Sequence, residues 1–200
     1  GEFVLVKKYI LIAGVNGAGK STLYQTLHSL HEMIRVNTDE IVRRIGDWRS
    51  IERQIEAGKI AVSQLKECFE KGVTFNQETT LCGKSVIKNI KKAKEKGYII
   101  ELHYVGVDSV EIAKKRVRYR VEHGGHGIPE RMIEKRYSES LQNLQKVLPL
   151  CDLALMYDNT ESFRRFAIYR RGTAARVSHI VPLWYVKLIE EEKKIRVTEL

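Results

Sequence analysis

Short apolar runs alternate with longer helix-like segments along most of this chain. Five strands are predicted where apolar runs occur, at residues 9–13, 34–36, 73–75, 98–105 and 153–157. Helices are predicted where apolar residues recur with helical spacing. They cover residues 21–30, most of the segment between position 39 and residue 71, residues 85–96 and 109–122, and the segment from just beyond Pro129 to residue 147. This alternation predicts an α/β fold with a central, mostly parallel five-stranded sheet flanked by helices.

The last part of the chain continues beyond the fifth predicted strand. Residues 166–169 are predicted to be one strand of a hairpin that turns at Gly172, so residues 163–200 form a short C-terminal extension of hairpin and helix. The chain of 200 residues is close to the size of one α/β domain, and it has no internal repeat or Pro/Ser-rich linker. We therefore predict one domain over residues 1–200.

A glycine-rich segment between the first predicted strand and the first predicted helix carries a complete phosphate-binding pattern. Its residues are Gly14, Val15, Asn16, Gly17, Ala18, Gly19, Lys20 and Ser21, followed by Thr22. The glycines allow backbone N–H groups to point at a polyphosphate, Lys20 can reach the β- and γ-phosphates, and the Ser21 hydroxyl can ligate Mg²⁺. The N-terminus of the following helix adds positive potential. The segment predicts binding of ATP or GTP with Mg²⁺.

Polar residues also follow other predicted strands at their carboxyl ends. They lie at positions 37–39 after the second strand, 76–80 after the third and 158–159 after the fifth. Because ligands of parallel α/β sheets bind beyond the carboxyl ends of the strands, we expect these segments and the phosphate-binding loop to converge on one crevice.

Within these segments, carboxylates and hydroxyls are the candidates for handling a phosphate acceptor. Asp39 is the candidate catalytic base, in a loop after a strand expected beside the phosphate-binding loop. The alternative is that Asp39 caps the helix that follows it. Glu78, Thr79 and Thr80 are candidates for binding acceptor hydroxyls, and a turn with satisfied side chains is the alternative.

Four arginines flank a glycine-rich joint. Arg116 and Arg120 lie four residues apart on one helical face, and Arg131 and Arg136 follow the joint at residues 124–129. Guanidinium groups on such a joint can close over a γ-phosphate, so residues 116–147 are predicted to be a helical lid with candidate catalytic arginines. A solvated basic hairpin is the alternative. The two histidines there, at positions 123 and 126, have no partner with metal-ligand spacing and are interpreted as hinge or surface residues.

The charge of the chain favours anionic ligands. Lys and Arg total 35 and Asp and Glu total 25, so the net charge is +10, which suits a nucleotide, a phosphorylated sugar, a nucleic acid or a membrane surface. No apolar stretch approaches membrane-spanning length and no signal sequence precedes the first strand, so we expect a cytoplasmic protein without a membrane partner. Its three cysteines form no C-x-x-C pair and predict neither a zinc site nor a disulfide framework.

Taken in order, these motifs resemble the zeta-toxin-like P-loop kinases. The resemblance covers about residues 8–160 and rests on the phosphate-binding loop, Asn-Thr-Asp-Glu-Ile from position 37, Phe-Asn-Gln-Glu-Thr-Thr-Leu from position 75, the strand that begins near position 97, the arginine-rich segment with Gly-Gly-His-Gly-Ile-Pro, and Tyr-Asp-Asn-Thr from position 157. It implies a P-loop fold of nucleoside-kinase type that phosphorylates a hydroxyl with ATP or GTP. The best-known toxins act on a UDP-activated N-acetylated amino sugar, and an antitoxin protein covers their nucleotide site.

The resemblance also implies residue roles. Lys20 and Ser21 match the family's phosphate and Mg²⁺ positions, Asp39 its catalytic base, and Glu78 with Thr79 its acceptor-sugar motif. Arg116 or Arg120, together with a second arginine beyond the glycines, would match the lid arginines. An ungapped alignment through Pro129 places His126 at a position where the toxins have arginine.

The expected function is therefore a kinase for a hydroxyl of a small molecule. A nucleotide-gated switch ATPase that binds nucleic acid is an alternative that the mixture of Arg, Tyr and Phe near residues 163–171 allows, although the sequence carries no nucleic-acid-binding fold signature. A kinase for a nucleoside or an RNA end is the other alternative.

Overall fold

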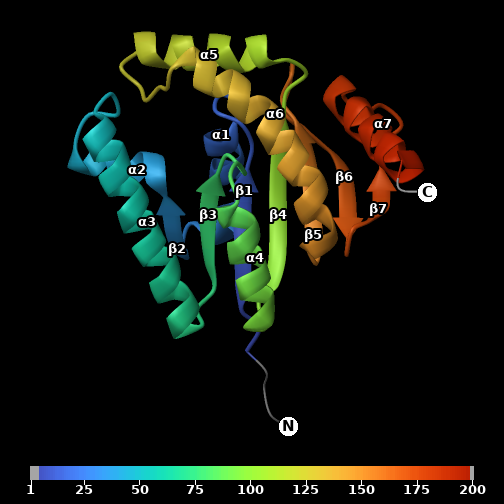
Figure 1. The fold of residues 1–200 in the computed structure, drawn as a ribbon, viewed down its shortest axis with the longest axis horizontal. Helices are drawn as coiled ribbons and strands as arrows, with labels where there is room; N and C mark the ends of the chain where they lie inside the picture. The colour runs from blue at the N-terminus through green and yellow to red at the C-terminus, as the bar shows by residue number, and fades with distance from the viewer. Residues whose placement is uncertain (1–4, 199–200) are drawn as a thin grey trace.

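Seven strands form one sheet in the computed structural model, which describes residues 5–198 (Figure 1). The strands are β1 (Lys8–Ala13), β2 (Ile34–Asn37), β3 (Phe75–Thr79), β4 (Ile99–Gly106), β5 (Leu153–Asp158), β6 (Arg164–Arg170) and β7 (Thr173–Val177). They lie in the order β2-β3-β1-β4-β5-β6-β7, and the first five are parallel. The predicted mostly parallel α/β sheet is confirmed. The predicted number of five strands is wrong, because the C-terminal hairpin β6–β7 pairs antiparallel with the edge of β5.

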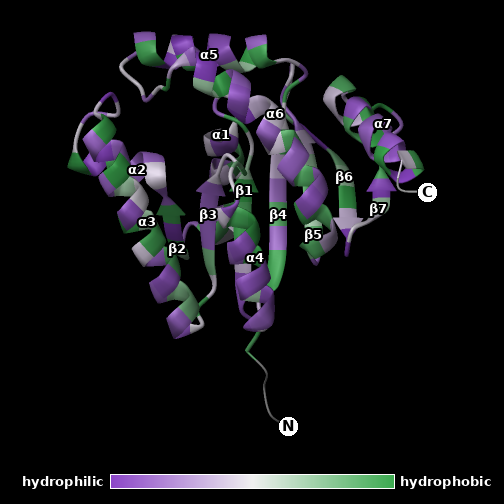
Figure 2. Ribbon diagram, viewed as in Figure 1, coloured by the Kyte–Doolittle hydropathy of each residue, from purple (hydrophilic) through white to green (hydrophobic). Residues whose placement is uncertain are grey.

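Helices cover both faces of this sheet. They are α1 (Lys20–Thr26), α2 (Thr38–Ile45), α3 (Ile51–Lys71), α4 (Ser85–Glu95), α5 (Val110–Glu122), α6 (Glu130–Val147) and α7 (Leu183–Thr198), with short 3₁₀ turns at His28–Leu30 and Leu148–Leu150. Figure 2 shows hydrophilic and hydrophobic residues mixed along the helices, as expected where one side of each helix is buried. Within residues 5–198, no helix is long and apolar enough to cross a membrane.

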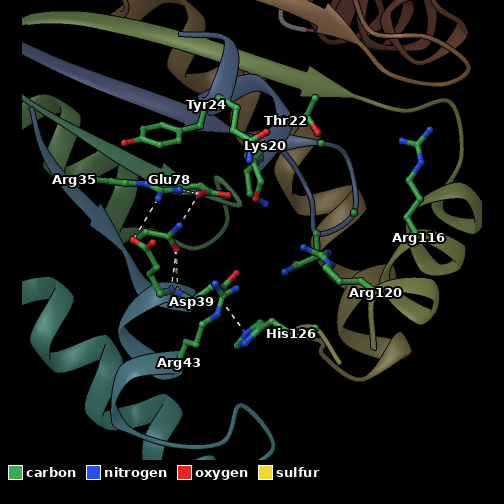
Figure 3. Close-up of a pocket in the computed structure, with 18 of the residues that line it drawn as sticks. Lys20, Thr22, Tyr24, Arg35, Asp39, Arg43, Glu78, Arg116, Arg120 and His126 are labelled. Carbon is green, nitrogen blue, oxygen red and sulfur yellow. Dashed lines mark hydrogen bonds and ion pairs between the residues drawn. The ribbon is translucent and has the colours of Figure 1, made fainter. Parts of the chain in front are cut away.

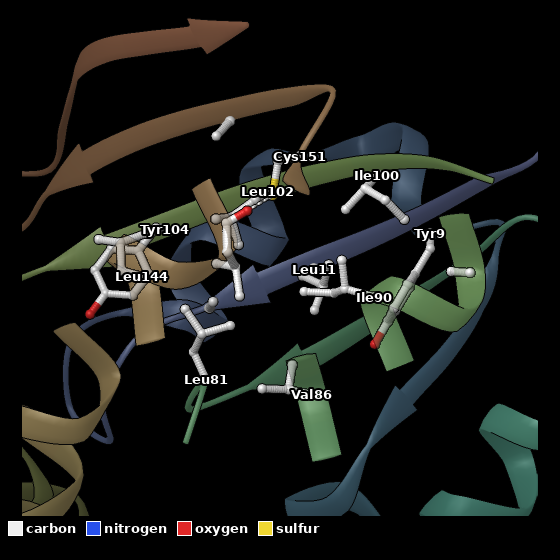
Figure 4. Close-up of a cluster of buried hydrophobic side chains, with 14 of the residues drawn as sticks. Tyr9, Leu11, Leu81, Val86, Ile90, Ile100, Leu102, Tyr104, Leu144 and Cys151 are labelled. Carbon is white, nitrogen blue, oxygen red and sulfur yellow. Dashed lines mark hydrogen bonds between the residues drawn. The ribbon is translucent and has the colours of Figure 1, made fainter. Parts of the chain in front are cut away.

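Alternate residues of β1 contribute to two separate hydrophobic clusters. Tyr9 and Leu11 belong to a cluster that takes side chains from α2, α3, α4, α6 and α7, part of which is drawn in Figure 4. Ile10 and Ile12 belong to a second cluster with side chains from α1, α5 and one residue of α6. Because successive residues of a strand point to opposite faces, β1 is buried on both sides and reads as a continuous apolar run.

The order of the first three strands differs from the sequence-based expectation. β3 lies between β1 and β2, so β2 is not the neighbour of the strand that leads into the phosphate-binding loop. β3 also extends to Thr79, whereas a strand over residues 73–75 was predicted. Its polar residues obscure the apolar pattern, yet they pair in register with both neighbours: Glu78 lies opposite Ile12 of β1 and Asn37 of β2. The pairing is made by backbone groups, which side-chain polarity does not reveal.

The C-terminal extension is packed into the fold through Trp184. This side chain is 2% exposed and contacts the rings of Tyr104 and Phe166. Its Nε1–H donates to Oδ1 of Asp158 over 3.1 Å. A Cβ atom at Gly106 would lie 2.4 Å from the indole, so only glycine fits beneath it. The extension therefore completes one face of the sheet.

Replacing Trp184 by phenylalanine should lower the free energy of unfolding by about 1–2 kcal/mol, because the variant keeps an aromatic ring but leaves Oδ1 of buried Asp158 without the indole donor. Urea unfolding followed by circular dichroism measures the change. Val186→Ala on the same helix is the control, because Val186 is 36% exposed and its truncation should change stability by less than about 0.5 kcal/mol. Equal stability of the Phe variant and the wild type would show that the Asp158 bond does not stabilise the fold.

Candidate active site

The phosphate-binding loop joins β1 to α1 and is held by contacts on its outer side. Gly17 has φ of 83°, and a Cβ atom there would lie 2.5 Å from the carbonyl oxygen of Ala113 on α5. Gly19 has φ of 114° and sits against the amide of Asn159, which donates to the carbonyl of Ala18 over 3.0 Å. Both positions need glycine, because the left-handed backbone and the close neighbours exclude a side chain. The structure places this loop between strand and helix as the sequence predicts, although α1 is shorter than the predicted helix over residues 21–30.

Lys20 places a buried ammonium group inside this loop. The residue is 8% exposed, and its Nζ donates to the carbonyl of Gly14 over 2.7 Å. Burial lowers the pKa of Lys20, and the nearby charges of Arg120 and Arg136 act in the same direction against those of Glu78 and Asp39. Among the described residues, no carboxylate forms an ion pair with Nζ. The ammonium is therefore available to an anion that enters the loop.

Two pockets meet at Lys20. The loop pocket, with a volume of about 710 Å³, extends from the phosphate-binding loop to α5. The side pocket, with a volume of about 770 Å³, extends from Lys20 towards the start of α3 and the start of α6. Residues that line both pockets are Asn16, Lys20, Asn37, Asp39 and Glu78. Two ligands bound in these pockets would therefore approach each other beside Lys20 and Asp39.

The sequence analysis placed Asp39 in a loop, but the structure places it in the first turn of α2. The helix is capped by Asn37, whose Oδ1 accepts from the backbone N–H groups of Asp39 and Glu40 over 3.0 and 3.3 Å. The alternative that Asp39 itself is the cap is therefore wrong, and its carboxylate is free for another role. Burial alone would raise the pKa of Asp39, but contact with His126 and the charges of Lys20 and Arg120 outweigh it and leave the pKa below its usual value.

Glu78 is held in place by two residues of β2. Its side chain is 9% exposed, and its Oε2 accepts from Arg35 over 2.9 Å and from Asn37 over 2.6 Å (Figure 3). The sequence analysis did not single out Arg35, and it noted Asn37 only as part of the polar segment at positions 37–39. Their spacing could have indicated this role. Arg35 and Asn37 flank the buried Val36, so both side chains lie on the face of the strand opposite to that of Val36.

Thr79 and Thr80 line the side pocket next to Glu78. The Thr79 hydroxyl also accepts from the backbone N–H of Leu81 over 3.0 Å, so part of its hydrogen-bonding capacity is used by the turn after β3. The structure brings all three predicted acceptor-binding residues to the same wall, although Glu78 and Thr79 lie within the strand and not in a loop after it.

The four candidate arginines do not gather over one point. Arg120 lines the loop pocket, whereas Arg131 and Arg136 line the side pocket. Arg136 donates to Oδ1 of Asn16 over 3.1 Å and so connects α6 to the phosphate-binding loop. Arg116 lines the loop pocket, but it donates to the backbone carbonyls of Asn159 and Thr160 over 2.6 and 3.2 Å.

His126 was interpreted from the sequence as a hinge or surface residue, and the structure does not place it at the surface. Its side chain is 9% exposed, and Nε2 lies 3.2 Å from Oδ1 of Asp39. The ring also lies against Trp48, with 5.8 Å between ring centroids. Sequence reasoning missed this contact because it joins the α5–α6 connection to α2, two segments far apart in the chain.

The polar residues after β5 contribute indirectly. Asp158 turns away from the pockets and accepts from Trp184 and from the Thr160 hydroxyl, the latter over 2.7 Å. Asn159 contacts the outer side of the phosphate-binding loop through Ala18. Of the four polar segments predicted to converge on one crevice, three line the pockets, namely the phosphate-binding loop and the segments after β2 and β3. The fourth, after β5, supports the phosphate-binding loop from outside the pockets.

The loop pocket is suited to Mg²⁺ bound together with a polyphosphate. Ser21 and Thr22, which directly follow Lys20, are exposed, carry hydroxyl groups and line this pocket. Mg²⁺ takes oxygen ligands in octahedral geometry and commonly keeps several waters, with one or two protein ligands and phosphate oxygens completing the shell. The Ser21 hydroxyl fits that requirement.

The sequence of the chain matches a family model and a bacterial relative. The Zeta toxin family model matches residues 5–177. An uncharacterized protein of Haemophilus influenzae is 35% identical over 135 residues, which is 68% of this chain and 96% of that protein.

Solved structures show the same fold at low sequence identity. A crystal structure of AvrRxo1-ORF1 and -ORF2 with ATP has a TM-score of 0.71 at 14% identity, and the match covers 93% of this chain but only 63% of that chain. A structure of the PezAT chromosomal toxin–antitoxin system of Streptococcus pneumoniae has a TM-score of 0.60 at 18% identity, and the match covers 99% of this chain and 88% of that chain. The predicted P-loop kinase fold is confirmed.

Proposed function

This chain belongs to the zeta toxin family, and we propose that it transfers the γ-phosphoryl group of ATP or GTP to a hydroxyl group of a small molecule. The observation that carries the proposal is the meeting of the loop pocket and the side pocket at Lys20 and Asp39. A donor in the first pocket and an acceptor in the second would bring a phosphoryl group and a hydroxyl together, which is what a kinase requires.

Each residue at the junction has a role in this reaction. The oxygen of the acceptor hydroxyl bonds to the γ-phosphorus, and the Asp39 carboxylate accepts the hydroxyl proton. At the same time the bond between the γ-phosphorus and the β–γ bridging oxygen breaks. Lys20 and the backbone N–H groups of the loop hold the β- and γ-phosphates, and Arg120 offsets charge that develops on the transferred group. Mg²⁺, when bound at Ser21, supplies further neutralisation of phosphate charge.

The side pocket is consistent with a UDP-activated amino sugar as the acceptor. Glu78, Thr79 and Thr80 offer hydrogen-bonding groups for sugar hydroxyls close to Asp39. Further along the pocket, Trp48 offers an aromatic surface with the Arg49 guanidinium 4.4 Å from its ring centroid, and Arg131 offers a second cation. An aromatic ring and guanidinium groups suit a base and a diphosphate.

We also propose a protein partner that acts as an antitoxin. The PezAT structure is described as a toxin–antitoxin system. In this chain, a partner that fills the loop pocket would exclude the nucleotide from Lys20. Such a partner would have to offer anionic groups, because Arg43, Arg116 and Arg120 line that pocket.

A product assay tests the proposed reaction. The protein is incubated with ATP or GTP, Mg²⁺ and a panel of hydroxyl compounds that includes UDP-sugars, nucleosides and RNA with a 5′-hydroxyl, and phosphorylated products are identified by mass spectrometry. A product that gains one phosphate and is missing from an Asp39→Asn control supports the proposal. Nucleotide hydrolysis without any phosphorylated acceptor would favour the switch ATPase instead, and a phosphorylated RNA end would make the protein an RNA-end kinase.

The two pockets predict different effects of two arginine variants. Arg120→Ala should lower kcat at least about tenfold with little change in the KM for ATP, because this guanidinium is expected to act as the phosphoryl group moves. Arg131→Ala should mainly raise the KM for the acceptor, because Arg131 lines the side pocket. Steady-state kinetics with both substrates varied separates the two constants.

Two further variants make this comparison specific. Arg120→Lys should restore little activity, because a compact ammonium does not reproduce the planar fork of a guanidinium. Arg118→Ala on the same helix is the control, since Arg118 is 55% exposed and pairs with Glu130. Unchanged kcat for Arg120→Ala and unchanged acceptor KM for Arg131→Ala would show that these arginines take no part in the reaction. The segment would then be the solvated basic hairpin that the sequence analysis gave as the alternative.

A further inference from the structure

The connection between α5 and α6 brings a histidine into contact with the candidate base. His126 Nε2 lies 3.2 Å from Oδ1 of Asp39, and the histidine side chain is 9% exposed whereas that of Asp39 is 43% exposed (Figure 3). The next residue, Gly127, would bring a Cβ atom within 3.1 Å of the Trp48 ring, so the chain passes closely over the indole. The imidazole is therefore confined between Trp48 and the carboxylate.

This contact determines how the Asp39 carboxylate is held. The backbone of Asp39 is fixed by the Asn37 cap, but its side chain has His126 as its one ion-pair partner among the described residues. The largely buried imidazole, with Nε2 3.2 Å from Oδ1, limits rotation of the carboxylate and leaves Oδ2 for an acceptor hydroxyl. General-base catalysis depends on such orientation, since small displacements from the reacting geometry cost large factors in rate.

We propose that His126 is a positioning residue that orients Asp39 for proton transfer, and that protonation of its ring weakens Asp39 as a proton acceptor and slows phosphoryl transfer in mildly acidic conditions. The inference rests on the proposed kinase function. It deepens that function by coupling the α5–α6 connection, which lines the loop pocket, to the base that acts on the acceptor.

The direction of the effect follows from charge. A protonated imidazole beside Oδ1 stabilises the ionised carboxylate, and a more stable carboxylate takes a proton from a hydroxyl less readily. The pKa of Asp39 lies below its usual value, so the protonation of Asp39 itself falls in stronger acid. Histidine side chains ordinarily titrate between about pH 5 and 8. His31 and His123 also line the loop pocket, so a loss of activity in that range points to His126 only if His126→Gln removes it.

Other charged and titratable groups around the ring belong to several elements. Arg43 and Glu40 lie on α2 with Asp39, Arg120 lies on α5, and Lys20 lies on α1. These residues line the loop pocket with His126, as do Glu78 of β3, His31 and His123. Asp47, in the connection between α2 and α3, is close enough for its carboxylate to respond to charge on His126. Adding a proton to the ring thus adds positive charge beside the Asp39 carboxylate.

The test compares pH profiles of three variants. For the wild type, kcat should fall at least about tenfold between pH 7.5 and 5.5. His126→Gln keeps an N–H donor that does not titrate, so it should retain activity within about threefold at pH 7.5 and lose most of the acid decrease. His126→Ala should lower kcat about tenfold at pH 7.5 without changing the KM for ATP. His179→Gln is the control, because His179 is exposed between β7 and α7.

A second measurement does not depend on turnover. Carbon-13 NMR of the Asp39 carboxyl group should show its pKa rising towards the usual value in His126→Ala, because the contact that lowers it is removed. The proposal would be overturned by an unchanged Asp39 pKa in this variant, or by the same acid decrease of kcat in His126→Gln as in the wild type. If the wild type transfers no phosphate but the Asp39 pKa responds, the kinase function fails and the contact is supported.

Discussion

Lys20→Ala is expected to reduce phosphoryl transfer by about 10²–10³-fold. The Lys20 ammonium is buried inside the phosphate-binding loop, where a positive charge stabilises the transferred group far more than it would in water. The charges of Arg120 and Arg136 also act on the Lys20 ammonium, but Arg136 donates to Asn16, and Arg120 lies on α5 and not in the phosphate-binding loop. Neither replaces Lys20. Single-turnover transfer from ATP, with the nucleotide saturating, measures the loss.

The control for this variant is Lys91→Ala, which removes an exposed lysine from α4 and should leave transfer unchanged. Circular dichroism establishes that Lys20→Ala folds. A folded Lys20→Ala protein with near-normal single-turnover rates would contradict the assignment of residues 14–21 as the nucleotide-binding loop.

Asp39→Asn is expected to reduce transfer at least about 100-fold while nucleotide affinity stays the same. The amide has the shape of the carboxylate but cannot accept the hydroxyl proton. Because Asn37 and not Asp39 caps α2, the substitution should leave the cap of the helix intact. Steady-state kinetics gives kcat, and isothermal titration calorimetry with a non-hydrolysable ATP analogue gives the affinity.

A matched control is Glu52→Gln, which neutralises an exposed carboxylate near the start of α3. Its kcat should equal that of the wild type. If nucleotide affinity of Asp39→Asn falls as much as kcat does, Asp39 acts on the donor side, and the proposed base and the role of His126 both fail.

The sequence alone determined the features that depend on neighbouring residues. The phosphate-binding loop is a contiguous pattern whose glycines and lysine have local roles, so its position between β1 and α1 could be predicted directly. The parallel strands were predicted from apolar runs separated by helical spacing, because strands buried on both faces are apolar throughout. The polar ends of β2 and β3 were noticed for the same local reason, although the length of β3 was underestimated.

Only the tertiary structure decided which of these segments touch. Strand order is set by long-range pairing, so the sequence did not reveal that β3 separates β2 from β1 or that β6 joins the edge of β5. The division of Arg120 and Arg131 between two pockets depends on how α5 and α6 pack over the sheet. The contact between His126 and Asp39 depends on the same packing. Local propensity carries no record of such contacts, because they form between residues distant in the chain only once the hydrophobic faces of helices and sheet have been buried together.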